Sequence, residues 1–176
     1  MSIGKLEGVE LRELWLDEER GFSTWLGNNV DVLSEALGLS LTVEGRDKPV
    51  GAFRVDLIAR DAGGDRVIIE NQLNLTDDDH LGKLLTCLIN LDSNVAIWIV
   101  KEARPEHVRV VSWLNEISPP NITFYLVEVK AYRIAGSDPA PLFTAIVKPT
   151  EESNEVGDDR KKLAAIDLHS YIAEKY

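Results

Sequence analysis

Two stretches, Phe53-Arg54-Val55-Asp56-Leu57-Ile58-Ala59 and Val67-Ile68-Ile69-Glu70-Asn71-Gln72, decide the fold of this chain. Their β-branched and aliphatic residues favour strands, and the intervening Asp61-Ala62-Gly63-Gly64-Asp65 is typical of a hairpin turn. Because strand side chains alternate between faces, Glu70 and Gln72 point to one face and Asn71 to the other. In the favourable register Asp56 lies opposite Glu70, whereas a slip of one residue would turn Asp56 to the far face. We therefore predict that Asp56, Glu70 and Gln72 converge.

Apolar periodicity predicts the remaining elements outward from this hairpin. Helices are expected over residues 22–38, from a capping box of Thr76 and Asp79, and from Pro105 with Val110, Leu114 and Ile117 facing inward. Further strands are expected over residues 39–44, 95–100, 122–129 and 143–147. Early antiparallel strands followed by alternating strands and helices indicate an α/β fold with a mixed sheet and helices on both faces.

Composition sets the limits of the interpretation. A length of 176 residues suits one domain, which we place at residues 1–150, followed by an acidic linker and terminal helix at 151–176 that could lead to a second domain. One cysteine, Cys87, excludes an intramolecular disulfide, and no apolar run is long enough to span a membrane. We expect a cytoplasmic protein, with Trp25, Trp98 and Trp113 in the core.

The net charge of −11 argues against tight non-specific binding of DNA by this domain. Most of the acidic excess lies at the two ends and in the run Asp77-Asp78-Asp79, whereas residues 39–75 and 101–133 are nearly balanced. A modest basic rim around a central site is therefore compatible with the sequence.

The carboxylates of Asp56 and Glu70 give the hairpin a chemical interpretation. Two like charges in a partly desolvated place repel each other unless a cation lies between them. Oxygen ligands suit Mg²⁺ or Mn²⁺, which keep several waters and leave room for a phosphate. The alternative from spacing alone is that these carboxylates face solvent or pair with arginines such as Arg54 and Arg60.

The order of these residues resembles the PD-(D/E)XK, or restriction-endonuclease-like, superfamily. The resemblance rests on Glu35 in a helix, then Val55-Asp56, then Glu70-Asn71-Gln72, and it runs from about residue 10 to residue 150. The segment Asp79-His80-Leu81-Gly82-Lys83-Leu84-Leu85-Thr86 is similar to a prokaryotic branch with an Asp…Glu-x-Gln motif. The resemblance implies a three-layer restriction-endonuclease-like core and metal-dependent hydrolysis of nucleic acid, with DNA as the expected partner.

The resemblance also implies roles for individual residues. Asp56 and Glu70 would bind Mg²⁺ or Mn²⁺, joined by the backbone carbonyl of Asn71 and by Glu35. Gln72 stands where the superfamily has a lysine and would position the attacking water, although glutamine brings no charge. The remaining candidates are Lys83, which could restore the missing charge or be an ordinary exposed lysine, and His80 and Arg54, which could contact the nucleic acid.

Two alternatives stay open at this point. The change from lysine to Gln72 and the acidic charge both favour a catalytically inactive module on the same fold, used for nucleic-acid docking or protein assembly. A homodimeric scaffold that uses the strand at residues 122–129 as its interface is the third interpretation.

Overall fold

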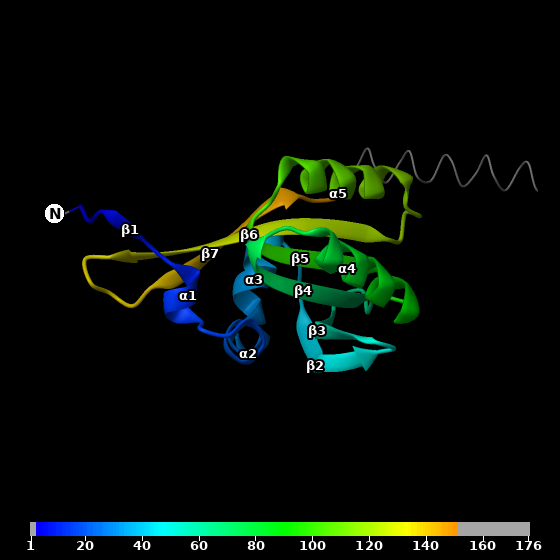
Figure 1. The fold of residues 1–176 in the computed structure, drawn as a ribbon, viewed down its shortest axis with the longest axis horizontal. Coiled ribbons are helices and arrows are strands. Elements are labelled where there is room, and N and C mark those ends of the chain that lie inside the picture. The colour runs from blue at the N-terminus through cyan, green and yellow to red at the C-terminus, as the bar shows by residue number, and fades with distance from the viewer. Residues whose placement is uncertain (1–2, 151–176) are drawn as a thin grey trace, which may run out of the picture.

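Seven strands form one mixed sheet, and helices cover both of its faces (Figure 1). The structure is a computed structural model that describes residues 3–150. The strands are β1 (Leu6–Val9), β2 (Thr42–Val50), β3 (Phe53–Arg60), β4 (Arg66–Leu75), β5 (Val95–Glu102), β6 (Thr123–Ile134) and β7 (Ala140–Val147). The helices are α1 (Leu11–Leu14), the π-helix η1 (Glu18–Ser23), α2 (Thr24–Asn28), α3 (Val30–Leu37), α4 (Asp78–Asn90) and α5 (Pro105–Ile117).

The strand order is β1-β6-β5-β4-β3-β2, with β7 also paired to β6. Strands β2, β3 and β4 run antiparallel, whereas β4, β5 and β6 are parallel and are connected through α4 and α5. The predicted α/β fold with a mixed sheet flanked by helices is therefore confirmed.

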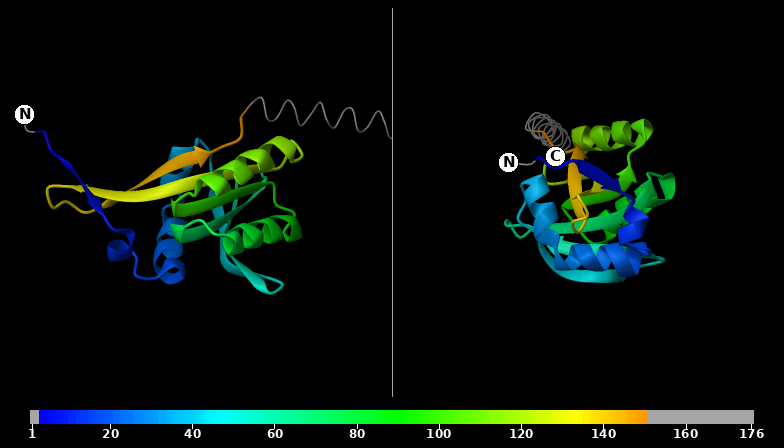
Figure 2. Two further views of the ribbon diagram at one scale, coloured as in Figure 1. Left: turned by 45° about the horizontal axis from the view of Figure 1, so that its top comes forward. Right: turned by 90° about the vertical axis from the view of Figure 1, so that its left-hand side faces the viewer.

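Each face of the sheet buries its own apolar cluster. Residues such as Leu57, Ile69 and Ile97 pack with the N-terminal helices, while Ile68, Trp98 and Leu126 pack with α4 and α5. Figure 2 shows the blue N-terminal helices and the green helices separated by the sheet. The central strands are apolar on both faces, as parallel strands buried by helices require.

The N-terminal part differs from the prediction of one helix over residues 22–38. Asn29 has φ −132° and ψ 39°, so it separates α2 from α3, and its side chain donates to the backbone oxygen of Trp25. The chain before α2 forms η1. Its apolar residues do not recur at the three- or four-residue spacing that predicts an α-helix. The strand predicted at residues 39–44 begins at Thr42 and continues to Val50, and β1 was not predicted.

The cap of α4 and the buried side of α5 both differ from the prediction. Asp77, not Thr76, caps α4, because its side chain accepts a hydrogen bond from the His80 backbone N–H. Thr76 instead accepts from the Arg104 N–H and contacts the ring of His107. On α5 the buried residues are His107, Val111 and Asn115, while Val110, Ile117 and Trp113 are exposed, so the predicted inward face is wrong except for the half-buried Leu114.

Strand β6 makes its backbone pairs within the chain. Residues 123–128 pair with β5, and residues 126–132 pair with β7. The strand at residues 122–129 is therefore not an open edge of the sheet, and a homodimer that uses this region stays a prediction. The far ends of β6 and β7 project with β1 as an arm from the body (Figure 1).

Two expectations about the whole chain can be compared with residues 3–150 alone. Within residues 3–150, no helix is long and apolar enough to cross a membrane. The acidic linker and terminal helix predicted at residues 151–176 lie outside the described residues.

Candidate active site

The β3–β4 hairpin brings Asp56 and Glu70 to the same place. The turn closes over residues 61–65, and the strand register places Leu57 opposite Ile69, which puts Asp56 opposite Glu70 one step further on. The backbone N–H of Asn71 donates to Asp56 Oδ2 at 2.7 Å. This is the register that the turn and the alternation of side chains predict.

A lysine from the helix after β4 reaches both carboxylates. Lys83 Nζ lies 2.5 Å from Glu70 Oε1 and 3.5 Å from Asp56 Oδ1. The helix α4 lies directly over the sheet here, because Leu84, Cys87 and Leu88 bury its apolar side next to Lys83. One ammonium therefore lies within reach of both acidic groups.

Burial dominates the electrostatics of this cluster. Burial first, and then the charge of Asp56, raise the pKa of Glu70 to about 8 against the opposing effect of Lys83. Burial also raises the pKa of Asp56, against the favourable effects of Lys83 and the Asn71 N–H. For Lys83, burial disfavours the ammonium, but Asp56 and Glu70 outweigh it and raise the pKa. Without a divalent cation, Glu70 is therefore mostly protonated at neutral pH, and Lys83 keeps its charge beside Asp56.

The opposite face of β4 is tied to η1. Asn71 Nδ2 donates to Ser23 Oγ at 2.8 Å, and Glu18 Oε2 accepts from the Leu73 N–H at 2.5 Å. Asn71 and Ser23 are buried, and Asn71 Oδ1 has no hydrogen-bond partner among the described residues. These contacts hold η1, with Glu18 and Glu19, against the strand that carries Glu70.

Glu35 lies elsewhere. It is exposed on α3 and does not line the pocket that contains Asp56. The helical glutamate beside the cluster is Glu18, whose charge acts on Glu70. Sequence reasoning missed Glu18 because η1 has no apolar period; the run Asp17-Glu18-Glu19 was the available signal.

Gln72 points to the same side of the sheet as Glu70, but its side chain does not bind Lys83. Its Nε2 donates to the Leu75 backbone oxygen and to Asp77 Oδ2, each at 2.6 Å. The side chain is buried and does not line the pocket. Gln72 thus joins β4 to the cap of α4, the helix that carries Lys83.

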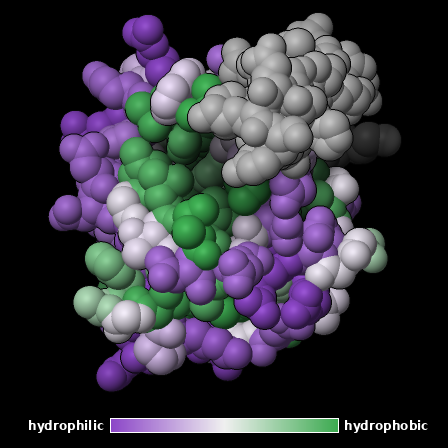
Figure 3. Space-filling model, turned by 90° about the vertical axis from the view of Figure 1, so that its right-hand side faces the viewer, coloured by the Kyte–Doolittle hydropathy of each residue, from purple (hydrophilic) through white to green (hydrophobic). Residues whose placement is uncertain are grey.

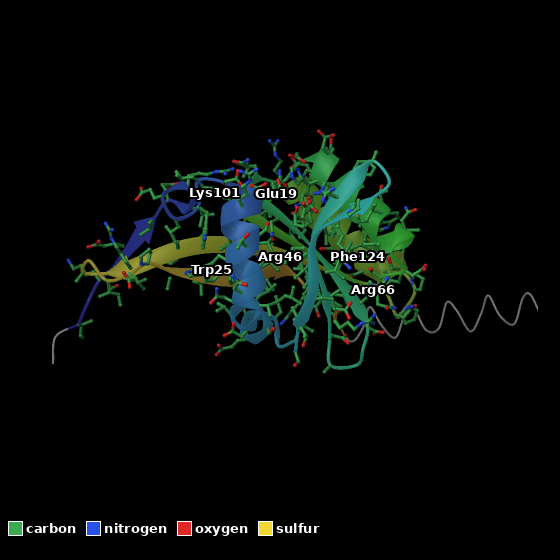
Figure 4. The ribbon with its side chains drawn as sticks, turned by 90° about the horizontal axis from the view of Figure 1, so that it is seen from below. Glu19, Trp25, Arg46, Arg66, Lys101 and Phe124 are labelled. Atoms are coloured by element: carbon green, nitrogen blue, oxygen red, sulfur yellow. The ribbon has the colours of Figure 1, made fainter. Side chains whose placement is uncertain are left out.

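His80 and Arg54 line the pocket, and both are engaged by acidic neighbours. His80 Nδ1 lies 2.7 Å from Asp77 Oδ1. The guanidinium of Arg54 binds the Asp47 carboxylate through Nε and Nη2, and also the Asp47 backbone oxygen. Figure 4 shows Glu19 on η1 beside the β2–β3 hairpin that carries Asp47 and Arg54.

The pocket has a volume of about 330 Å³ and an acidic lining. The lining residues are Asp17, Glu18, Glu19, Ser23, Asp47, Arg54, Asp56, Glu70, Asn71, His80 and Lys83. Six of these are carboxylates, against one arginine and one lysine. The immediate surroundings of the cluster are therefore acidic, and the basic rim that the sequence allowed is not found here.

The donor set fits a divalent cation only with help from water or substrate. Among residues 3–150, no three histidine, cysteine, aspartate or glutamate side chains are grouped so as to hold a metal ion. Asp56 and Glu70 alone are a carboxylate pair of the kind that Mg²⁺ uses together with waters and phosphate oxygens. Burial and the charge of Asp56 raise the pKa of Glu70 despite Lys83, and a cation bound between the two carboxylates would lower that pKa.

Comparison with solved structures finds partial similarity. No protein-family model matches the sequence, and no curated protein matches it at a significant level. A repair endonuclease from Pyrococcus abyssi is similar over 54% of this chain and 42% of its own, with 16% identity and a TM-score of 0.47. A complex of EndoMS with dsDNA is similar over 53% of this chain and 40% of the other, with 17% identity and a TM-score of 0.47.

A protein of unknown function from Silicibacter pomeroyi is similar over 78% of this chain and 84% of its own, with 13% identity and a TM-score of 0.29. The chain spans less than half the length of the two endonucleases.

Proposed function

We propose that the pocket around Asp56, Glu70 and Lys83 binds Mg²⁺ or Mn²⁺ and hydrolyses a phosphodiester bond in nucleic acid. The observation that carries the proposal is the convergence of two desolvated carboxylates and one ammonium at the base of an open pocket. Perturbed titratable groups in a cleft are typical of functional sites. The superfamily resemblance of Asp56 and Glu70-Asn71-Gln72 points to the same chemistry.

Asp56 and Glu70 would hold the cation. When bound, the cation would polarise a phosphate oxygen and lower the pKa of water. Glu70 must lose its proton to become a ligand, and although its side chain is buried it lines the pocket. Glu18 already accepts from the Leu73 N–H, so in this arrangement it fixes η1 at the rim of the pocket.

Lys83 is the group that can neutralise charge on a phosphate. Its ammonium is held on the side of the pocket by α4, and binding of a cation between Asp56 and Glu70 would release it from Glu70. A released ammonium 3.5 Å from Asp56 stays in the pocket and can donate to a phosphate oxygen. Lys83 then supplies the positive charge that Gln72 lacks, while Gln72 positions the helix that carries Lys83.

Cleavage of nucleic acid tests the proposal. Supercoiled plasmid, linear duplex, single-stranded DNA and RNA are each incubated with Mn²⁺ and with Mg²⁺. The wild type is expected to cleave at least one of them, and Asp56→Asn and Glu70→Gln are expected to lose that activity. Asp47→Asn is the matched control, since Asp47 lines the pocket but is bound to Arg54. Equal cleavage by the wild type and Asp56→Asn would contradict the proposal.

A second function is favoured by the same ammonium. Lys83 already supplies a cation between the two carboxylates, which would make the cluster a self-compensated remnant of a metal site. The protein would then be an inactive module for docking or assembly, and the acidic pocket lining agrees with a protein partner more than with nucleic acid. No cleavage of any substrate, together with no effect of Mn²⁺ on the melting temperature, would select this function.

A further inference from the structure

Helix α5 presents an apolar stripe to solvent. Val110, Trp113 and Ile117 are 37%, 54% and 44% exposed, and their spacing of three and four residues places them on one side of the helix. The buried side of the same helix is formed by His107, Val111 and Asn115, so the stripe is a second face. A single exposed apolar residue is ordinary, but a continuous helical stripe marks an interaction surface.

Strand β7 ends beside α5. Ile146 is 39% exposed, and the next residue, Val147, packs in the same buried cluster as Val111 of α5. Figure 3, which faces the side of the molecule where α5 ends, shows apolar side chains gathered over a hollowed area. The last strand of the sheet therefore brings the chain to α5, the helix that carries the stripe.

We propose that residues 163–176 of the same chain cover this surface. Their sequence has the spacing of an amphipathic helix: Ala165, Leu168 and Ile172 recur at three and four residues, while Asp167 and Glu174 fall on the other side. An apolar side of this kind matches the stripe of α5 in chemistry, and two antiparallel or crossed helices bury such stripes against each other. The inference is independent of the proposed function.

The chain between β7 and residues 163–176 is long enough for the segment to reach the stripe of α5. Residues 148–162 can span up to about 50 Å when extended, against a length of about 20 Å for a helix the size of α5. Because the segment follows β7, which contacts α5, its effective concentration at the stripe would be on the order of millimolar. Arg160-Lys161-Lys162, directly before Leu163, would complement the charge of the exposed Glu116 on α5.

Quenching of Trp113 fluorescence by acrylamide tests the proposal in the full chain. The fluorescence of Trp113 is isolated by subtracting, in each background, the fluorescence of the protein that carries Trp113→Phe. Trp15 and Trp98 are buried and are therefore less accessible to acrylamide. Replacing Leu168 and Ile172 by aspartate should release the segment and raise the quenching constant of Trp113 roughly twofold or more, as its contacts are lost. The control, Ser153→Asp with Ser170→Asp, adds the same two charges at polar positions and should leave quenching unchanged.

Two results would overturn the proposal. Equal quenching in the wild type and in Leu168→Asp/Ile172→Asp would show that the segment does not cover Trp113. Protection of Trp113 that disappears on dilution, with a matching change in oligomeric state, would show that a second copy of the chain covers α5 instead.

Discussion

If Glu70 must lose a proton before it binds a cation, then affinity for Mn²⁺ must depend on pH. The pKa of Glu70 is raised to about 8, so the deprotonated fraction is about a half at pH 8 and about one hundredth at pH 6. Affinity should therefore fall about tenfold for each pH unit below this pKa, or roughly 50-fold between pH 8 and pH 6, and level off above it. One proton should be released for each cation bound at low pH.

Isothermal titration calorimetry in buffers of different ionisation enthalpy measures both the affinity and the number of protons released. Glu70→Gln removes the titrating group and should bind weakly with little dependence on pH. His80 also lines the pocket and can carry a proton, so His80→Asn serves as the control and should keep the dependence of the wild type. Constant affinity between pH 6 and pH 8, or the same slope in Glu70→Gln, would refute the reasoning.

Three further outcomes are expected. Asp56→Asn should abolish the rise in melting temperature that Mn²⁺ causes in the wild type, because a ligand of the folded state is lost; an undiminished rise would place the cation elsewhere. Lys83→Met should lower the unfolding free energy of the metal-free protein by about 1–3 kcal/mol, since the change leaves Asp56 and Glu70 without their ammonium. In thermal melts, Mn²⁺ should then stabilise the Lys83→Met protein more than it stabilises the wild type. Gln72→Ala should cost about 1–3 kcal/mol in urea unfolding through lost bonds to Leu75 and Asp77, with Mn²⁺ affinity unchanged; a large loss of affinity would put Gln72 in the site.

The same pKa has a consequence for stability. The folded-state pKa of Glu70 lies above its ordinary value of 4.5, so the folded protein holds a proton that the unfolded chain has released between these two values. Stability from this group is complete below pH 4.5 and is lost as the pH rises toward about 8, at about 1.4 kcal/mol per unit. Glu70→Gln should flatten that part of the profile of unfolding free energy against pH.

The hairpin and its carboxylate pair could be predicted because both follow from local rules. The turn over residues 61–65 sets the register, and the alternation of side chains sets the face of Asp56 and Glu70. Alternation also gave the correct side for Gln72, but not its partner, since Asp77 reaches Gln72 only once α4 has folded back over β4.

The errors arise where tertiary contacts override periodicity. On α5 the sequence favoured an inward Val110 and Ile117, yet the inner positions are held by His107 and Asn115. Asn115 exchanges two hydrogen bonds with the backbone of Phe124, and His107 bonds Thr76, so these polar side chains are satisfied inside. Glu35 was expected in the site only from the superfamily resemblance, and the helix that reaches the site is η1.

A crystal structure with Mn²⁺ at pH 8 or above, recorded at a wavelength that gives an anomalous signal, tests the central claim most directly. We expect one anomalous peak bonded to oxygens of both Asp56 and Glu70, with Lys83 Nζ moved away from Glu70. A cluster that keeps Lys83 Nζ between the two carboxylates at saturating Mn²⁺, with no anomalous peak, would contradict it.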